Sequence, residues 1–420
     1  MGNGKKKILF VHQNFPGQYK HIAYALSIDN DKYDVHTLSI QKFEDKKTTN
    51  HHYNINSSNV KGVNQWAVEF ETKMIRANAC AKKAMQLKQN GFYPDLIIGH
   101  PGWGETFFLK EVWPNAKTIS YVEFYYKTSD CDIDFDLDLI ENTLKRDFEE
   151  FHQYNQFKLN ARNAPFTHIY SISDYLVCPT EFQKDLLPDI IKPNVQVIHD
   201  GIDTDYLMPI EDLSVKIGDK TFTKKNKIIT YVSRSLDPYR GFHIFVNSIP
   251  KILKDNPEAN ILIVGNAETQ GYGATPPEGK MYKEIFYEPI EDEIDNSRVH
   301  FLGRIPYESF VKIIQLSTIH VYLSYPFVLS WSMLEAMSCG ALVIGSNTAP
   351  VTEVLHDEKN GLIVDFFDSN SIAEKITHVL NNSNKYSDLR KNARKTIIDN
   401  YDLKTVCLPR HLDLINEALK

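Results

Sequence analysis

VYLSYPFVLSWSMLEAMSCGALVIG, residues 321–345, joins two apolar runs through a loop and a short helix. The first run, residues 321–324, and the second, residues 341–345, have the length and composition of buried strands. The helix between them begins near Met333 and ends at the pair Cys339-Gly340. A strand, a helix and a second strand in this order predict one βαβ unit of an open parallel sheet.

The loop of this unit, from Phe327 to Ser332, is a candidate ligand contact, because ligands of open parallel sheets bind beyond the carboxyl ends of the strands. Its hydroxyl and N–H groups would meet the ligand at a helix N-terminus, which favours anions. Glu335 lies one turn into the helix and could accept hydrogen bonds from sugar hydroxyls. A plain βαβ unit with a surface glutamate has the same pattern.

Length and composition are those of an ordinary globular protein. The 420 residues suffice for two domains with separate cores, and 42% hydrophobic and 24% charged residues are typical values. The formal net charge of −7 argues against a nucleic-acid backbone as the main partner. Five scattered cysteines lack metal-ligand spacing, so a reducing, cytoplasmic setting is expected rather than a disulfide framework.

A membrane-spanning segment is not expected, because no apolar run has the length that crosses a bilayer. The run at residues 8–11 is also too short for a secretory signal. Peripheral contact with a membrane stays open through the helix expected over residues 73–88. This helix carries five basic residues: Lys73, Arg76, Lys82, Lys83 and Lys88. A solvated helix face is the simpler interpretation of these charges.

The first loop of the chain is a second candidate. The strand expected at residues 7–11 leads into a loop that contains Pro16, Gly17 and Gln18, and a helix follows from Tyr19. A strand, a glycine loop and a helix start form the usual arrangement for holding an anion. A tight turn without a ligand has the same pattern, so both interpretations stay open.

His100 stands directly after the apolar strand expected at residues 95–99, at the start of a loop with glycine and proline. A histidine at the carboxyl end of a parallel strand is well placed for a cleft. A lone histidine is more often structural, and position alone does not decide between the two roles.

Residues 130–138 form an acidic run in which every second residue is an aspartate: Asp130, Asp132, Asp134, Asp136 and Asp138. The run could be a metal-binding D-x-D motif or, with Glu141, a calcium loop. Phe135 occupies the position where an EF-hand needs glycine, which argues against calcium. A solvated acidic loop is favoured, and it could form one wall of an acceptor site.

The second half opens with a strand at residues 228–233, which Arg234 and Arg240 follow. Arginine pairs phosphate oxygens through two parallel hydrogen bonds, and a helix start after Arg240 favours an anion further. Two surface arginines are the plain alternative. Further strand ends are expected at Gly265 and before the turn that holds Arg304 and Ile305.

The segment from Leu334 to Gly340 resembles the Glu-Ala-Met-Ala-Cys-Gly signature of retaining glycosyltransferases of family 4, which have the two-domain GT-B fold. Residues 350–354 and 360–364 resemble further motifs of this family, in the same order. The first half resembles the family only in the loops around Gly17 and His100.

The resemblance implies a role for each candidate residue. Glu335 would hold the ribose of a nucleotide sugar, and Arg234 with Arg240, which takes the place of a family lysine, would clamp its diphosphate. His100 would bind the donor sugar near the reacting carbon and is the candidate catalytic residue. The other candidates fall into three groups: the glycine loop Pro16, Gly17 and Gln18; the donor-sugar loop Phe327, Ser330, Trp331 and Ser332; and the vicinity of the base, Gly265, Arg304 and Ile305.

Phe327 departs from the family pattern, which has a glutamate eight residues before the ribose-binding one. The family glutamate faces the donor sugar, whereas a phenylalanine ring accepts no hydrogen bond from sugar hydroxyls. The identity of the sugar therefore stays open. The departure also motivates the alternative of a binding protein that has lost the chemistry.

The expected fold is α/β, GT-B, with two Rossmann-like domains whose parallel sheets face each other across a cleft. Residues 1–206 are expected to form the acceptor-side domain, 207–226 a linker, and 227–402 the domain that binds the nucleotide sugar. Residues 403–420 are expected to form a helix that crosses back to the first domain, as terminal helices do in GT-B proteins.

The expected function is transfer of a hexose-type sugar from a UDP- or GDP-sugar to a glycan, lipid-linked or small-molecule acceptor, with retention. No metal and no other cofactor is expected, and the protein would be a monomer or a homodimer. Another GT-B enzyme, such as an epimerase or a phosphorylase, and a non-catalytic nucleotide-sugar-binding protein stay open as alternatives.

Overall fold

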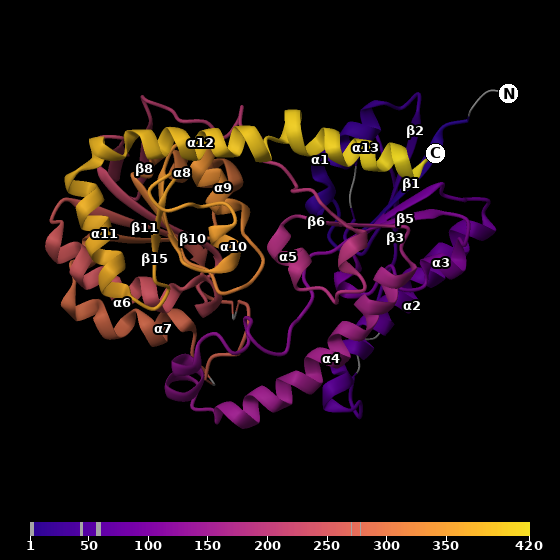
Figure 1. Cartoon of the computed structure of the whole chain (residues 1–420), viewed down its shortest axis with the longest axis horizontal. Coiled ribbons are helices and arrows are strands. Elements are labelled where there is room, and N and C mark those ends of the chain that lie inside the picture. Colours follow the sequence, from indigo (N-terminus) through magenta and orange to yellow (C-terminus); the bar gives the residue numbers. More distant parts are fainter. Residues whose placement is uncertain (1–3, 43–44, 56–59, 270, 278) are drawn as a thin grey trace. The chain divides into compact units, whose positions relative to one another are not determined.

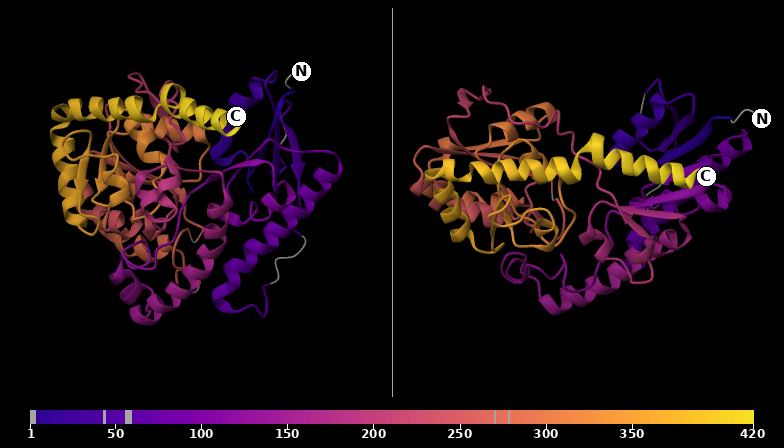
Figure 2. Two further views of the ribbon diagram at one scale, coloured as in Figure 1. Left: turned by 45° about the vertical axis from the view of Figure 1, so that its right-hand side comes forward. Right: turned by 45° about the horizontal axis from the view of Figure 1, so that its top comes forward.

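The computed structural model describes residues 4–42, 45–55, 60–269, 271–277 and 279–420. The chain divides into two compact α/β units (Figure 1 and Figure 2). Unit 1 comprises Met1–Ser129, Glu149–Gly201 and Lys404–Lys420, and unit 2 comprises Asp130–Phe148 and Ile202–Leu403. Each unit has its own parallel sheet, which confirms the predicted fold class of two Rossmann-like units.

In the described residues of unit 1, seven parallel strands form a sheet in the order β3-β2-β1-β4-β5-β6-β7. The strands are β1 (Lys6–Val11), β2 (Tyr33–Ser39), β3 (Thr49–His52), β4 (Leu96–Gly99), β5 (Lys117–Tyr121), β6 (Tyr175–Cys178) and β7 (Val195–Val197). The helices are α1 (Lys20–Ile28), α2 (Val68–Gln89), α3 (Leu109–Val112), α4 (Phe148–Ile172), α5 (Glu181–Asp185) and α13 (Leu408–Ala418).

Strand β1 shows why the sheet of unit 1 is covered on both faces. Ile8 and Phe10 belong to one core cluster, with α1 and α13, while Leu9 and Val11 belong to another, with α2 and α3. Successive side chains of a strand point to opposite faces, so a continuous apolar run requires helices on both sides. All four side chains are fully buried.

In the described part of unit 2, six parallel strands form a sheet in the order β12-β11-β10-β13-β14-β15. The strands are β10 (Lys227–Ser235), β11 (Ala259–Asn266), β12 (Val299–Gly303), β13 (Ile319–Tyr322), β14 (Leu342–Ser346) and β15 (Leu362–Val364). The helices are α6 (Phe242–Asp255), α7 (Tyr282–Phe286), α8 (Tyr307–Leu316), α9 (Trp331–Ser338), α10 (Ala349–Thr352), α11 (Ser369–Asn381) and α12 (Ser387–Tyr401). Strands β13 and β14 and helix α9 are the βαβ unit predicted from residues 321–345.

The segment expected as a linker, residues 207–226, is part of unit 2 instead. It contains an antiparallel hairpin of β8 (Ser214–Ile217) and β9 (Lys220–Thr223), with Gly218 in the turn at a φ of 57°. Phe222 on β9 is buried in one cluster with Ile228 and Leu262. The sequence of the segment is rich in polar residues because the other face of the hairpin is exposed to solvent, which is a common pattern for an antiparallel pair.

The boundary expected at residue 206 also differs from the structure in two places. The chain enters unit 2 at Ile202, and residues 130–148, which we call the insertion segment, belong to unit 2 although β5 and α4 on either side belong to unit 1. At the other end, α13 belongs to unit 1, where Leu414 and Ile415 join the cluster of Ile8 and Phe10.

Helix α2 departs from the expectation of a solvated basic face at one of the five basic residues, Lys73. Lys73 is buried, and its Nζ lies 5.0 Å from the ring centre of Phe166. Burial and the neighbouring Arg162 lower the pKa of Lys73 to about 8. The ammonium group therefore faces an aromatic ring rather than solvent. None of the helices in the described residues has the length and apolar composition that crossing a bilayer requires.

Candidate functional site

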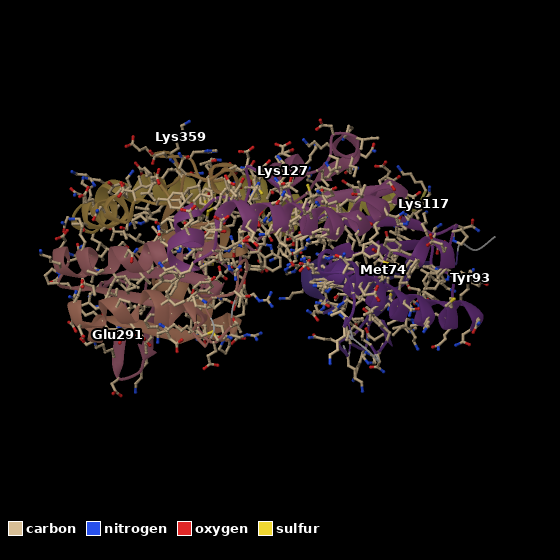
Figure 3. All side chains as sticks on the ribbon, turned by 90° about the horizontal axis from the view of Figure 1, so that it is seen from below. Met74, Tyr93, Lys117, Lys127, Glu291 and Lys359 are labelled. Atoms are coloured by element: carbon tan, nitrogen blue, oxygen red, sulfur yellow. The ribbon has the colours of Figure 1, made fainter. Side chains whose placement is uncertain are left out.

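The carboxyl ends of β4 and β5 bring His100 and Glu123 together in unit 1. His100 is fully buried, and its Nδ1 accepts a hydrogen bond of 3.1 Å from the Gly102 N–H. The ring proton of the neutral histidine is therefore on Nε2, which lies 3.4 Å from Glu123 Oε2. Figure 3 shows Tyr93 and Lys117 at one end of this unit, where they mark the amino ends of the same two strands.

The orientation of His100 is fixed by its neighbours. The rings of Trp103 and Tyr121 stack on it, with centroids 4.6 and 5.4 Å away. A Cβ atom at residue 102 would lie 2.6 Å from His100 Cε1, so only glycine lets the backbone N–H reach the ring. Such a pre-set ring, whose Nε2 makes no hydrogen bond with the described residues and lies near an accessible carboxylate, suits a group that binds a reacting molecule.

A second histidine, His12, extends the network toward the glycine loop. Its Nδ1 accepts from the Asn14 N–H at 3.0 Å, and its Nε2 donates to Gln18 Oε1 at 2.9 Å. Gln18 Nε2 in turn donates to Glu123 Oε1 at 3.2 Å. Burial and the nearby His100 lower the pKa of His12 to about 4, so this ring is neutral at physiological pH.

In the structure the glycine loop forms a tight turn that packs on His12. Gly17 has a φ of 47°, and a Cβ there would lie 2.6 Å from the His12 ring. The glycine lets the loop close over His12, and Pro16 precedes it as the first residue of the turn. Of the three predicted residues, Gln18 contributes its side chain to the network.

Glu123 is the residue that sequence reasoning missed in this unit. Its side chain is 41% exposed and contacts both His100 and Gln18. The available signal was positional: Glu123 follows the strand next to β4, two residues beyond its end. Polar residues after neighbouring parallel strands meet at one edge of the sheet.

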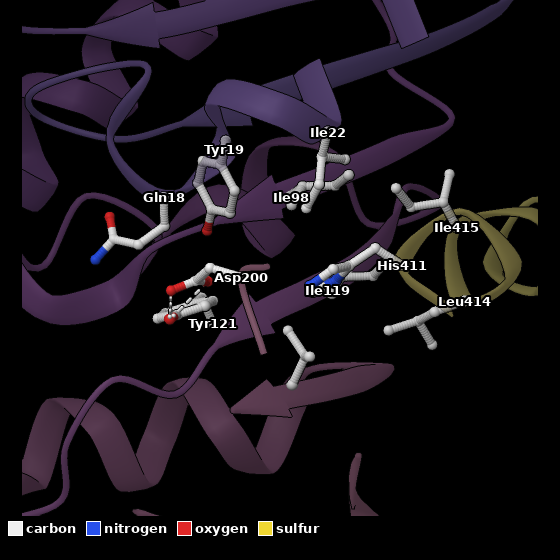
Figure 4. Close-up of a pocket in the computed structure, with 11 residues that line it drawn as sticks. Gln18, Tyr19, Ile22, Ile98, Ile119, Tyr121, Asp200, His411, Leu414 and Ile415 are labelled. Carbon is white, nitrogen blue, oxygen red and sulfur yellow. Dashed lines mark hydrogen bonds between the residues drawn. The ribbon is translucent and has the colours of Figure 1, made fainter. Parts of the chain in front are cut away.

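A small cavity lies near this network. Its volume is about 20 Å³, and it lies between the sheet and α13, with His411, Leu414 and Ile415 on its wall. Figure 4 shows the Tyr19 hydroxyl directed toward Asp200, whose carboxylate accepts from the Tyr121 hydroxyl at 3.0 and 3.1 Å. The cavity has room for about one water and none for a sugar.

In unit 2 the two predicted phosphate ligands have different surroundings. Arg234 is exposed at the carboxyl end of β10 and makes no hydrogen bond or ion pair with the residues that the structure describes. Arg240 is buried: Nη1 donates to the Tyr322 hydroxyl at 3.0 Å and Ser324 Oγ at 2.8 Å, and Nη2 donates to the Val328 carbonyl at 2.8 Å. Arg240 therefore holds the loop between β13 and α9.

Glu335 is a buried carboxylate on α9. Its Oε1 accepts a 2.6 Å hydrogen bond from the hydroxyl of Tyr307, the first residue of α8. Burial raises the pKa of Glu335 to about 7, although the Tyr307 hydrogen bond acts in the opposite direction. Ser330 caps the same helix by accepting from the Ser332 N–H at 3.3 Å. Trp331 is exposed, whereas Ser332 is buried.

Phe327, the candidate for a sugar contact, is itself buried among other side chains. The rings of Tyr239 and Tyr272 lie 5.2 and 5.0 Å from it, and the Arg240 guanidinium lies 5.7 Å away. Its ring fills the aromatic interior of the loop. The remaining candidates stand at strand ends of the same sheet: Gly265 in β11, and Arg304 and Ile305 directly after β12.

The acidic run is only partly the solvated loop that its sequence favours, because Asp130 and Asp138 are exposed but two other aspartates are buried. Asp132 and Asp136 are each 4% exposed and accept hydrogen bonds from side chains of unit 2. Asp134 caps the insertion segment by accepting from the N–H groups of Asp130 and Cys131, both at 2.8 Å. Across the described ranges, no group of three or more histidine, cysteine, aspartate or glutamate side chains is placed to hold a metal ion.

Two parallel-sheet α/β units of this kind define the GT-B class of glycosyltransferases. Residues 33–207 match the family described as Glycosyl transferase family 4 group, and residues 216–396 match Glycosyl transferases group 1. The chain belongs to the family 4, group 1 glycosyltransferases.

Similar proteins were found by sequence and by structure. An uncharacterized glycosyltransferase of Methanocaldococcus jannaschii is 26% identical over 241 residues, which are 56% of this chain and 57% of the relative. The chain thus spans about half the length of the curated relatives it matches. Among solved structures, sucrose-phosphate synthase from Thermosynechococcus elongatus aligns with a TM-score of 0.71 at 15% identity, over 98% of this chain and 99% of the other. Anabaena HepE in complex with UDP and glucose aligns at 0.65 and 14%, over 98% and 100%.

Proposed function

We propose that the protein transfers a hexose-type sugar from a nucleoside diphosphate sugar to a hydroxyl group of an acceptor. The observation that carries this proposal is Glu335, a buried carboxylate on α9 whose partner is a single tyrosine hydroxyl at 2.6 Å. A buried carboxylate that keeps acceptor capacity suits a ribose diol. Arg234, exposed at the end of a strand of the same sheet, supplies a cation for the diphosphate.

The chemistry follows from where charge develops. When the bond between sugar and phosphate breaks, the leaving diphosphate gains negative charge, which Arg234 and the N-terminus of α9 would stabilise. In unit 1, the His100 Nε2–H and the Glu123 carboxylate would bind the sugar or the acceptor hydroxyl. We name no protein nucleophile, and in the proposed reaction the departing phosphate takes the proton of the acceptor, with retention at the reacting carbon.

The donor is best sought among UDP- and GDP-sugars, because the similar Anabaena protein has been solved with UDP and with UDP-glucose. The acceptor is proposed as a glycan, a lipid-linked sugar or a small molecule. No resident metal is needed in this proposal, since the arginine and the helix N-terminus carry the role of a cation.

The test is a thermal-shift screen of UDP-glucose, GDP-mannose, UDP and GDP with EDTA in the buffer, followed by a donor hydrolysis assay. A ligand that binds only the folded protein raises the melting temperature in proportion to RT ln(1 + [L]/Kd). We expect a UDP or GDP compound to raise it and the matching sugar to be released slowly. No shift with any compound of the panel would refute a nucleotide-sugar site.

Phe327 favours one other candidate, a nucleotide-sugar-binding protein without catalysis. The residue is buried in an aromatic cluster and offers no acceptor to a sugar hydroxyl. Binding without any hydrolysis or transfer, at enzyme concentrations comparable to the donor, would favour this candidate over the transferase.

Alanine variants of Arg234 and Arg240 should distinguish an arginine that binds the nucleotide from one that stabilises the fold. We expect Arg234→Ala to weaken UDP binding about 10- to 100-fold with little change in melting temperature, because its guanidinium makes no hydrogen bond or ion pair with the described residues that the fold would lose. We expect Arg240→Ala to lower the free energy of unfolding by about 3 kcal/mol, because three acceptors lose a buried donor. Calorimetric titration with UDP and thermal melts measure the two effects.

The pair serves as its own control. Wild-type UDP affinity in both variants would exclude the arginines from the diphosphate site. An Arg240→Ala variant that melts like the wild type but loses UDP would show that Arg240 binds phosphate rather than holding the loop. Nε–H and one Nη2–H of Arg240 have no partner among the contacts given above, so the second outcome is chemically open.

A further inference from the structure

The insertion segment, Asp130–Phe148, leaves the sheet of unit 1 after β5, packs within unit 2, and returns to unit 1 at α4. A surface connection between a strand and a helix needs only a few residues. Here the connection is longer, and two of its alternating aspartates, Asp132 and Asp136, contact side chains elsewhere in unit 2. The contacts that it makes there point to a role.

Asp136 is the central contact. Its Oδ2 accepts from the Tyr325 hydroxyl at 2.6 Å and from His243 Nε2 at 2.9 Å, and its Oδ1 accepts from the Leu139 N–H at 3.0 Å. Burial alone would favour the neutral acid, but the hydrogen bond and charge of His243, followed by the other two donors, outweigh it and lower the pKa of Asp136. The buried group is therefore a carboxylate with three donors.

Asp132 makes the matching contact four residues earlier. Its Oδ2 accepts from the Tyr239 hydroxyl at 2.8 Å. The rings of Tyr239 and Tyr325 stack on each other with centroids 4.8 Å apart, so two aspartates of the insertion segment hold the hydroxyls of a stacked tyrosine pair. Burial beside Asp136 raises the pKa of Tyr325, which keeps its hydroxyl protonated as a donor.

Apolar contacts extend the interface to a third loop. Leu139 and Leu144 form one buried cluster with Tyr282, and Ala274 packs against that cluster. Ala274 and Tyr282 both belong to the segment that follows β11. The same segment reaches Tyr239, because a Cβ at Gly273 would lie 2.2 Å from the Tyr239 ring.

The partners of the insertion segment therefore come from the carboxyl ends of three neighbouring strands. Tyr239 follows β10, the segment with Ala274 and Tyr282 follows β11, and Tyr325 follows β13. In an open parallel sheet these loops form the ligand edge. The backbone joins two of them as well, since the Tyr325 N–H donates to the Tyr239 carbonyl at 2.9 Å.

We propose that the insertion segment is a brace that positions the three loops for the nucleotide-sugar donor, and that Asp136 is its main positioning residue. The inference rests on the proposed function for its ligand, and on the hydrogen bonds of Asp132 and Asp136 for its mechanism. The brace acts through Tyr325, which stands in the same loop as Val328 and Ser330. Asp136 itself touches no part of the donor.

The decisive variant is Asp136→Asn. An amide has one acceptor oxygen, so its NH₂ group must face either the Leu139 N–H or the donors of Tyr325 and His243, and at least one of the three hydrogen bonds is lost without a change of volume. We expect the donor KM, measured with UDP-glucose or the best compound of the panel, to rise about 5- to 20-fold with kcat changed less than 2-fold. Hydrogen exchange of residues 323–330 should become faster.

Two further variants make the test specific. Tyr325→Phe removes the same hydrogen bond from the other side, so the double variant should show no more than the larger single effect, because the two residues share one contact. Asp138→Asn is the matched control, because Asp138 belongs to the same alternating run, is exposed, and accepts only from the Asn142 side chain within the described part of the protein. We expect Asp138→Asn to behave like the wild type in every readout.

The possible results distinguish a brace that positions the loops from a contact that only stabilises the fold. They also distinguish a failure of the brace from a failure of the proposed function. A lower melting temperature with unchanged donor KM and unchanged exchange in residues 323–330 would overturn the brace. If the wild type binds no compound of the panel, the proposed function fails, and the exchange of residues 323–330 in Asp136→Asn still decides the brace. If Asp136→Asn does not fold, Tyr325→Phe carries the same test, because it keeps the carboxylate paired with His243.

Discussion

Replacing His100 by alanine is expected to lower sugar transfer by about 100- to 1,000-fold while leaving the affinity for free UDP or GDP within 2-fold. The loss follows from removing one pre-set N–H donor, Nε2, which lies 3.4 Å from the Glu123 carboxylate. Nucleotide affinity is spared because Arg234 and Glu335, the residues proposed for the diphosphate and ribose, belong to unit 2. Turnover and nucleotide titration are measured on the same preparation.

A matched variant separates chemistry from packing. His100 is fully buried and its ring stacks with Trp103 and Tyr121, so alanine also leaves a cavity. His100→Gln fills more of the space and keeps an N–H donor, and it should retain more activity than His100→Ala. Glu123→Gln, on the exposed side of the same contact, should lower turnover with little change in melting temperature. Wild-type turnover in a folded His100→Ala would remove His100 from the reaction.

Local patterns were sufficient for the fold and for the strand-end residues. The apolar runs around residues 321–345 predicted β13, α9 and β14, because a short apolar run, a capped helix and a glycine stop are encoded in neighbouring residues. His100, Arg234 and Glu335 became candidates by the same reasoning, since His100 and Arg234 directly follow predicted strands and Glu335 lies one turn into the helix after a third strand.

Residues that depend on contacts far apart in the sequence could not be found this way. His243 and Asp136 are separated by 107 positions, and Glu123 and Gln18 by 105. Alternating aspartates read as a solvated loop because nothing nearby in the sequence shows the tyrosine hydroxyls that pair with Asp132 and Asp136. The prediction of a linker at residues 207–226 was wrong for a related reason: Phe222 is buried in the core of unit 2, and the partly buried Val215 and Ile217 of the same hairpin pack against its cluster.

Arg240 also shows that contacts far apart in the sequence are hard to predict, even where the strand before it, β10, was predicted correctly. Its position after β10 suggested a phosphate ligand equal to Arg234, but the structure gives its guanidinium two hydroxyls and a carbonyl of the β13–α9 loop. An arginine at a strand end can bind a ligand or hold a neighbouring loop, and only the surrounding acceptors distinguish the two.

Glu335→Gln is expected to weaken UDP or GDP binding about 10- to 100-fold and, at the same time, to stabilise the protein at alkaline pH. A carboxylate offers a ribose diol two acceptor oxygens with charge, whereas glutamine offers one without charge. The Tyr307 hydroxyl, which donates to Oε1 at 2.6 Å, can donate equally to the amide oxygen. Folding should therefore tolerate the substitution better than binding does.

The stability effect has a definite sign. Burial raises the pKa of Glu335 from an ordinary 4.5 to about 7, so between these values the folded protein binds more protons at this site than the unfolded chain does. Unfolding free energy therefore falls as pH rises through that window, and above pH 7 the buried carboxylate costs about 3 kcal/mol. Glutamine carries no such cost, so thermal melts should show the variant more stable than the wild type at pH 8, with little difference at pH 4.5.

The titration of Glu335 should also appear in the pH dependence of nucleotide affinity. The effects on stability and on binding would then both come from this one carboxyl group. Wild-type affinity for UDP or GDP should rise as pH increases through about 7, because the ionised form of Glu335 is the better acceptor. The nucleotide's own phosphate also titrates in this range, but it does so equally in both proteins, so the wild-type curve minus the Glu335→Gln curve isolates the carboxyl group. Parallel curves, or a variant that binds UDP like the wild type, would show that the buried carboxylate of α9 does not hold the ribose.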